Sequence, residues 1–182
     1  MARVPYVERE ELDAEGQEIY DRIRRDRNSP TVSLQFRALL NSPKAAGHLT
    51  SMGAQLRFQS AVPENLKELA IILVAREWNS DIEWTAHAAL AAKAGVSAVS
   101  IEAIRTKKAL EGFIADEQVV ARFVHELIRR KDVPDAVFGA VEKLLGTRGA
   151  VDLTLTCSYY TALSLAQTAL KLGMEPGKAS TL

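Results

Sequence analysis

Apolar residues recur along the chain at the three- and four-residue spacing of α-helices. Between residues 63 and 78 one helical face is apolar and carries Leu66, Leu69, Ala70, Leu73 and Val74. Pro63 suits the first turn of this helix, because its missing N–H would have no partner there. Glu64 and Lys67 are expected on the solvent side. The next helix is predicted over residues 81–94, with Gly95 placed to end it.

Nearly every other segment also has a helical pattern. Helices are predicted over residues 10–27, 32–40, 44–58, 116–130, 134–145 and 151–172, and from a cap at Ser97 or Ser100 to residue 108. Gly146 and Gly173 fall at expected helix ends. The stretch "DLTLTCSYYT" alternates as a strand would, but it continues into "ALSLAQTALKLG", which favours one buried helix. The pattern predicts an all-α, single-domain helical bundle with an N-terminal helical arm over about residues 1–60 and a second helical half over about 113–174.

Composition narrows the classes of function. The 182 residues are 47% hydrophobic and 25% charged, and 23 Lys and Arg balance 23 Asp and Glu. A balanced charge gives no reason to expect nucleic acid or an anionic membrane as partner. Neither an apolar signal segment nor a membrane-spanning run is visible, so a cytoplasmic protein is expected. The single cysteine, Cys157, excludes an intrachain disulfide or CxxC pair and is expected to be buried and inert.

Candidate chemistry lies in "EWNSDIEWTAH", which ends at His87. Glu83 and His87 are four residues apart, so they share a helical face within hydrogen-bonding reach. Trp78 and Trp84 offer rigid walls for a pocket. A structural alternative stays open, because "SDIE" is a capping-box pattern in which Ser80 and Glu83 satisfy helix amides. On spacing alone this structural interpretation is favoured over catalysis.

Glu68 adds a third group. If the two helices form an antiparallel hairpin around "WNSD", Glu68 lies two to three turns before the bend and His87 about two turns after it. Both then face one crevice, which is a plausible geometry for a proton relay. Glu83 and His87 are also possible metal ligands, but two ligands are too few to predict a metal site.

The stretch "KELAIILVAREWNSDIEWTAHAALAAKAGVS" resembles the carboxymuconolactone decarboxylase and alkylhydroperoxidase D-like family, most closely over about residues 63–106. Redox members of that family carry a glutamate, a CxxC pair and a histidine, which fall on Glu68, on Ser80 and Glu83, and on His87. Both sulfurs are absent here. The resemblance implies an alkylhydroperoxidase D-like helical fold and a homo-oligomer, whether dimer, trimer or hexamer.

The resemblance and the residues together predict a cofactor-free lyase or isomerase that acts on a small carboxylated lactone or a related acid. His87 is expected to donate the proton, with Glu83 or Glu68 fixing its tautomer. Ser80, Trp78 and Trp84 are expected to bind substrate, and no cofactor or metal is expected. Two alternatives remain: a peroxide-handling, peroxiredoxin-like oxidoreductase, which the missing CxxC disfavours, and a non-catalytic binding protein.

Overall fold

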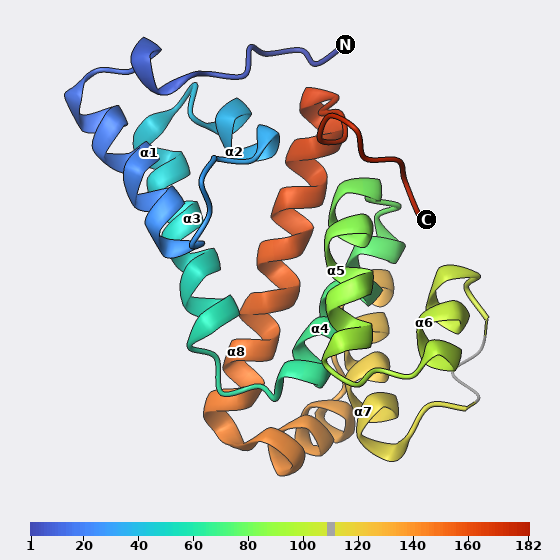
Figure 1. The fold of residues 1–182 in the computed structure, drawn as a ribbon. Coiled ribbons are helices and arrows are strands. Elements are labelled where there is room, and N and C mark those ends of the chain that lie inside the picture. The colour runs from blue at the N-terminus through green and yellow to red at the C-terminus, as the bar shows by residue number, and fades with distance from the viewer. Residues whose placement is uncertain (109–111) are drawn as a thin grey trace. The chain divides into compact units, whose positions relative to one another are not determined.

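The computed structural model describes residues 1–108 and 112–182, and within these ranges the chain forms helices and no strand (Figure 1). The prediction of an all-α protein is therefore confirmed. The elements in chain order are η1 (Arg9–Glu11), α1 (Ala14–Asp26), α2 (Leu34–Leu39), α3 (Pro43–Phe58), α4 (Glu64–Glu77), α5 (Asp81–Lys93), α6 (Ala98–Arg105), α7 (Ala115–His125), the π-helix η2 (Glu126–Arg130) and α8 (Asp135–Leu170).

The chain divides into two compact units. The first comprises Met1–Gln59 and Ala166–Lys178, and the second comprises Ser60–Leu165 and Ala179–Leu182. The candidate residues Glu68, Ser80, Glu83 and His87 all belong to the second unit.

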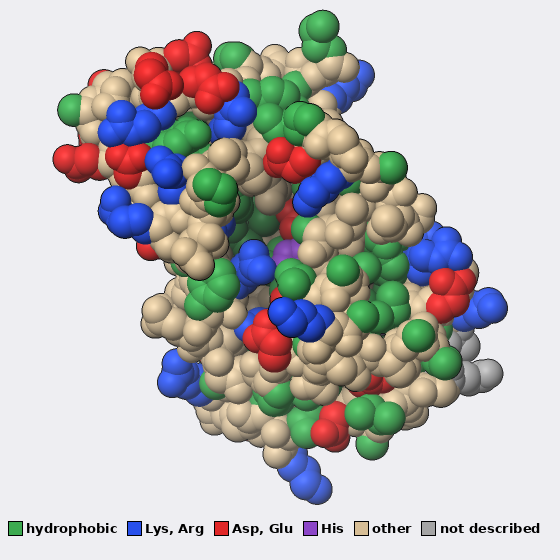
Figure 2. Space-filling model, in the orientation of Figure 1, with side chains coloured by type: hydrophobic (Ala, Val, Ile, Leu, Met, Phe, Trp, Pro, Cys, Tyr) green, Lys and Arg blue, Asp and Glu red, His purple; other side chains and the backbone are tan. Residues whose placement is uncertain are grey.

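In the first unit, α1 and α3 pack against each other. The side chain of Asp13 caps α1 by accepting the N–H of Gly16, and Pro43 opens α3. The segment after α8 is fastened to the same unit, because Glu175 accepts the N–H of Leu34 at 2.7 Å. Figure 2 shows acidic and basic side chains gathered over the part of this unit where α1 lies.

In the second unit, α4 packs against α5, α6 and α7. Every α4 residue from 66 to 75 is buried, so α4 is a central helix rather than a half-exposed one. The expectation that Lys67 faces solvent is therefore wrong. Its side chain is buried, and its ammonium reaches Glu64, which is exposed, at 2.6 Å. The long aliphatic stem of lysine suits such a position, because only the charged end needs a polar partner.

The predicted helix ends hold in part. Gly95 has a positive φ of 101° after α5, and Gly146 has a φ of 70° at a kink inside α8. Only glycine adopts this conformation without strain, so both glycines interrupt a helix as expected. At the end of α8, however, it is Lys171 with a φ of 51° that turns the chain, not Gly173. The "DLTLTCSYYT" stretch is helical, as predicted.

Cys157 is fully buried in α8, and burial raises the pKa of its thiol to about 12. The apolar surroundings disfavour the charged thiolate, which is the reactive form. No helix within residues 1–108 and 112–182 has the length and apolar character needed to cross a bilayer.

We predict that Cys157 does not react with a thiol-specific reagent such as an aromatic disulfide at pH 8 while the protein is folded. In denaturant the same reagent is expected to label one thiol per chain. Both results are measured by the absorbance of the released thiolate. Rapid labelling of the folded protein would contradict the burial of this side chain.

Candidate functional site

The turn between α4 and α5 fixes how the candidate residues meet. Asn79 has a left-handed φ of 50°. The N–H of Ser80 donates to the carbonyl of Ala75 at 2.8 Å, and the N–H of Asn79 donates to the carbonyl of Arg76. These are the two bonds of a Schellman motif, which ends α4. The Ser80 hydroxyl then accepts the N–H of Glu83 at 3.2 Å and caps α5. One serine therefore ends the first helix and starts the second.

This turn makes α4 and α5 an antiparallel hairpin, and the two helices lie side by side in the second unit (Figure 1). Glu68 on α4 and His87 on α5 meet across the hairpin, with 2.7 Å between Glu68 Oε2 and His87 Nδ1. On the opposite side of the imidazole, His87 Nε2 lies 3.7 Å from Glu83 Oε2. We call these three side chains the Glu–His–Glu network.

The whole network is buried. The exposed fractions are 1% for Glu68, 1% for Glu83 and 3% for His87. Ionised groups in such surroundings are stable only when each charge has a partner. Removing one member of a buried pair typically destabilises a protein by about 3–5 kcal/mol. The proximity of Glu68 and His87 is thus a structural requirement as well as a possible catalytic one.

The geometry also specifies where protons are needed. A carboxylate only accepts hydrogen bonds, so with Glu68 ionised the 2.7 Å contact requires an N–H on His87 Nδ1 that donates to Glu68. His87 Nε2 then faces the second carboxylate. Two facing acceptors repel each other, and a proton on either Nε2 or Glu83 removes that repulsion. His87 Nε2 and Glu83 Oε2 are 3.7 Å apart, so this carboxylate lies close to the ring without a direct hydrogen bond to it.

An aromatic side chain that sequence reasoning did not assign also contacts the network. The ring of Tyr160 on α8 stands edge-on to the imidazole of His87, with 5.0 Å between ring centroids and 82° between planes. Tyr159 packs edge-on to Tyr160 in turn, and both are buried. No spacing rule links α8 to α5, so only the fold reveals this contact. The apolar, aromatic contact strengthens electrostatic interactions within the network by excluding water.

The three predicted substrate-binding residues differ from one another in exposure. Trp84 is fully buried, whereas Trp78 at the end of α4 is 37% exposed and donates its indole N–H to Thr161 at 3.2 Å. Ser80 is buried and acts as the cap of α5. The serine half of the capping box is therefore formed. The backbone N–H of Ser80 donates to the carbonyl of Ala75 at 2.8 Å.

A second group of charges lies at the C-terminal end of α4. There Glu77 accepts a hydrogen bond from Arg129 Nε at 2.8 Å. Burial raises the pKa of Glu77, but the hydrogen bonds and charge of Arg129 outweigh it and hold the pKa below its usual value. Burial, and then Arg129, lower the pKa of His125, and the nearby Glu77 only partly offsets this. This group is an ordinary partly exposed ion-pair cluster, distinct from the Glu–His–Glu network.

The two carboxylates of the network approach different atoms of His87. The two carboxylates lie against opposite ring nitrogens of His87, so their oxygens do not converge on a common point. More broadly, residues 1–108 and 112–182 contain no group of three or more His, Cys, Asp or Glu side chains arranged to hold a metal ion.

Comparison with known proteins adds no family assignment: no protein-family model matches the chain, and no curated protein matches it. The resemblance to carboxymuconolactone decarboxylases therefore stays a prediction that rests on the residues quoted above.

We predict that Ser80→Ala lowers the free energy of unfolding by about 1 kcal/mol or more, because the N–H of Glu83 loses its cap. Ser97→Ala is the matched control, since Ser97 caps α6 through the N–H of Ser100 in the same way. Urea unfolding, followed by circular dichroism, gives the free energy of unfolding of both variants and of the wild-type protein. A normal loss in Ser97→Ala with no loss in Ser80→Ala would contradict the capping role of Ser80.

Proposed function

We propose that the Glu–His–Glu network is the acid–base centre of a cofactor-free lyase or isomerase that acts on a small carboxylated lactone or a related acid. The single observation that carries the proposal is the 2.7 Å contact between Glu68 and His87 inside a buried hairpin, with Glu83 on the opposite side of the ring. The resemblance of this hairpin to carboxymuconolactone decarboxylases suggests the substrate class.

The proposed reaction begins with cleavage of the bond between the substrate and its carboxylate carbon. Carbon dioxide leaves, and the electron pair stays on the substrate, where the lactone carbonyl delocalises it as an enolate. A proton carried by His87 Nε2 or by the Glu83 carboxyl group is then transferred to carbon, and water restores it to the network. Glu68 acts as a positioning residue, because its bond to Nδ1 fixes the ring orientation and leaves Nε2 for proton transfer. Buried surroundings favour such charge movement by excluding water.

The two alternatives differ from this proposal in testable chemistry. A peroxidase cycle with a thiolate nucleophile and a resolving thiol needs two cysteines, and the sequence has one, which is buried. A binding protein that keeps the fold without catalysis would use Glu68 and Glu83 only as structural partners of His87. Ligand binding without turnover distinguishes that case.

Assembly into a homo-oligomer is part of the proposal. The supporting observation is that α8 exposes Val151, Leu155 and Leu165, which are 50%, 41% and 48% accessible and spaced to share one side of the helix. Exposed large apolar side chains on one side of a helix are typical of surfaces that bind another protein chain.

We predict that the purified protein decarboxylates or isomerises carboxymuconolactone or one of its positional isomers, and that His87→Gln lowers kcat by about a hundredfold or more. Glu68→Gln is expected to lower kcat while changing KM little, because it disturbs the orientation of His87 and not the binding of substrate. His125→Gln is the matched control, since His125 lies outside the network. The rate at which substrate absorbance is lost gives kcat and KM for the wild-type protein and the three variants.

Circular dichroism must first show that each variant is folded, because the network is also structural. If the His87→Gln variant is folded and keeps the wild-type kcat, His87 does not take part in the mechanism. If lactone acids raise the melting temperature of the wild-type protein but none is turned over, the binding-protein alternative replaces the enzyme.

A further inference from the structure

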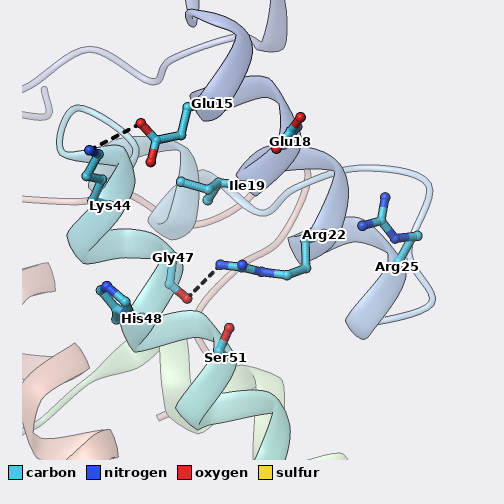
Figure 3. A pocket seen from close by; sticks show the side chains of 9 residues that line it. All are labelled: Glu15, Glu18, Ile19, Arg22, Arg25, Lys44, Gly47, His48 and Ser51. Atoms are coloured by element: carbon cyan, nitrogen blue, oxygen red, sulfur yellow. Dashed lines mark hydrogen bonds and ion pairs between the residues drawn. The ribbon is translucent and has the colours of Figure 1, made fainter.

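A cavity in the first unit, between α1 and α3, is independent of the proposed active site. Its volume is ≈ 380 Å³, within the range of about 300–1,000 Å³ typical of small-molecule sites. The side chains around it come from one face of each helix (Figure 3): Glu15, Glu18, Ile19, Arg22 and Arg25 of α1, and Lys44, Gly47, His48 and Ser51 of α3. None of these residues belongs to the Glu–His–Glu network.

Gly47 lies where Arg22 reaches from α1 to α3. A Cβ atom at this position would lie 2.8 Å from Arg22 Nη2, at the flexible end of that side chain, and 3.3 Å from Ile19 Cγ2, so Arg22 would have to shift. The missing side chain lets the guanidinium of Arg22 cross from α1 to α3, where Nη2 donates to the carbonyl of Gly47 at 3.1 Å (Figure 3). The arginine is thus held at the cavity by the backbone of the facing helix.

In residues 1–108 and 112–182, no acidic side chain pairs with the charge of Arg22. Within the described part of the chain its guanidinium forms no ion pair, and its Nε is buried without a hydrogen-bond partner. A buried donor without a partner is unfavourable and calls for an explanation. An arginine guanidinium that lines a cavity and has no acidic partner suits planar oxyanions, because its fork matches carboxylate and phosphate geometry.

At the other end of the cavity, Lys44 pairs with Glu15 at 3.3 Å, and these two side chains are 75% and 56% exposed. Exposed pairs of this kind contribute little and exchange partners readily. Lys44 is therefore available to a ligand that enters the cavity. Three cationic side chains face two acidic ones here, and the hydroxyl of Ser51 adds a neutral hydrogen-bonding group.

The geometry points to a binding site for a small oxyanion, a carboxylate or a phosphate, in the α1–α3 cavity, with Arg22 as its main ligand-binding side chain and Lys44 as the second. Neither this site nor its ligand depends on the proposed lyase activity.

The experiment is isothermal titration calorimetry of the full chain with inorganic phosphate and, separately, with succinate, at constant ionic strength. The wild-type protein is expected to bind at least one anion saturably at one site. Arg22→Gln is expected to weaken binding by about tenfold or more, because a charge-assisted bond is lost. Arg24→Gln is the matched control, since Arg24 is on the same helix but does not line the cavity.

Glu15→Gln provides a test that a folding defect cannot imitate. It frees Lys44 from its exposed partner, so anion binding is expected to become about two- to fivefold tighter. The preference between phosphate and succinate identifies the anionic group that the site selects. Absence of saturable binding of both anions to the wild-type protein, wild-type affinity in Arg22→Gln, or weaker binding in Glu15→Gln would each overturn the proposal.

Discussion

Two carboxylates and an imidazole are buried together between α4 and α5, and this burial constrains the rest of the second unit. Water has little access to groups that are at most 3% exposed, so other protein groups must supply their partners. The 2.7 Å bond between Glu68 and His87 does this on one side of the ring, and Glu83 Oε2 lies 3.7 Å from the nitrogen on the other side. The tight Asn79–Ser80 turn and the close packing of α4 on α5 keep these distances short.

The same arrangement explains why a structural role and a catalytic role are hard to separate from the sequence. Ser80 is a helix cap, as the capping-box pattern predicted, and Glu83 still lies beside His87. A cap and an acid–base pair are thus combined in one turn of α5. The cap sets the first turn of the helix, and the first turn sets the direction in which Glu83 and His87 point.

Local patterns predicted the helices well because helix periodicity, capping serines and left-handed glycines act over a few residues. The pairing of Glu68 with His87 was also predictable, since both lie a fixed number of turns from one short loop. The contact between Tyr160 and His87 was not, because it depends on how α8 packs against α5. Burial of Lys67 was missed for a similar reason: a helix that is covered on all sides has no solvent face for periodicity to reveal. The close approach of Arg22 to Gly47 in the α1–α3 cavity was not predictable either, because it depends on how these two helices pack.

The most direct test of the central claim is a ¹⁵N nuclear magnetic resonance measurement of the His87 ring nitrogens in the wild-type protein, assigned with His87→Gln. The account predicts that Nδ1 carries a proton at neutral pH and that this proton exchanges slowly with water, because it is buried in the bond to Glu68. An unprotonated Nδ1 with the proton only on Nε2, unchanged in Glu68→Gln, would contradict it.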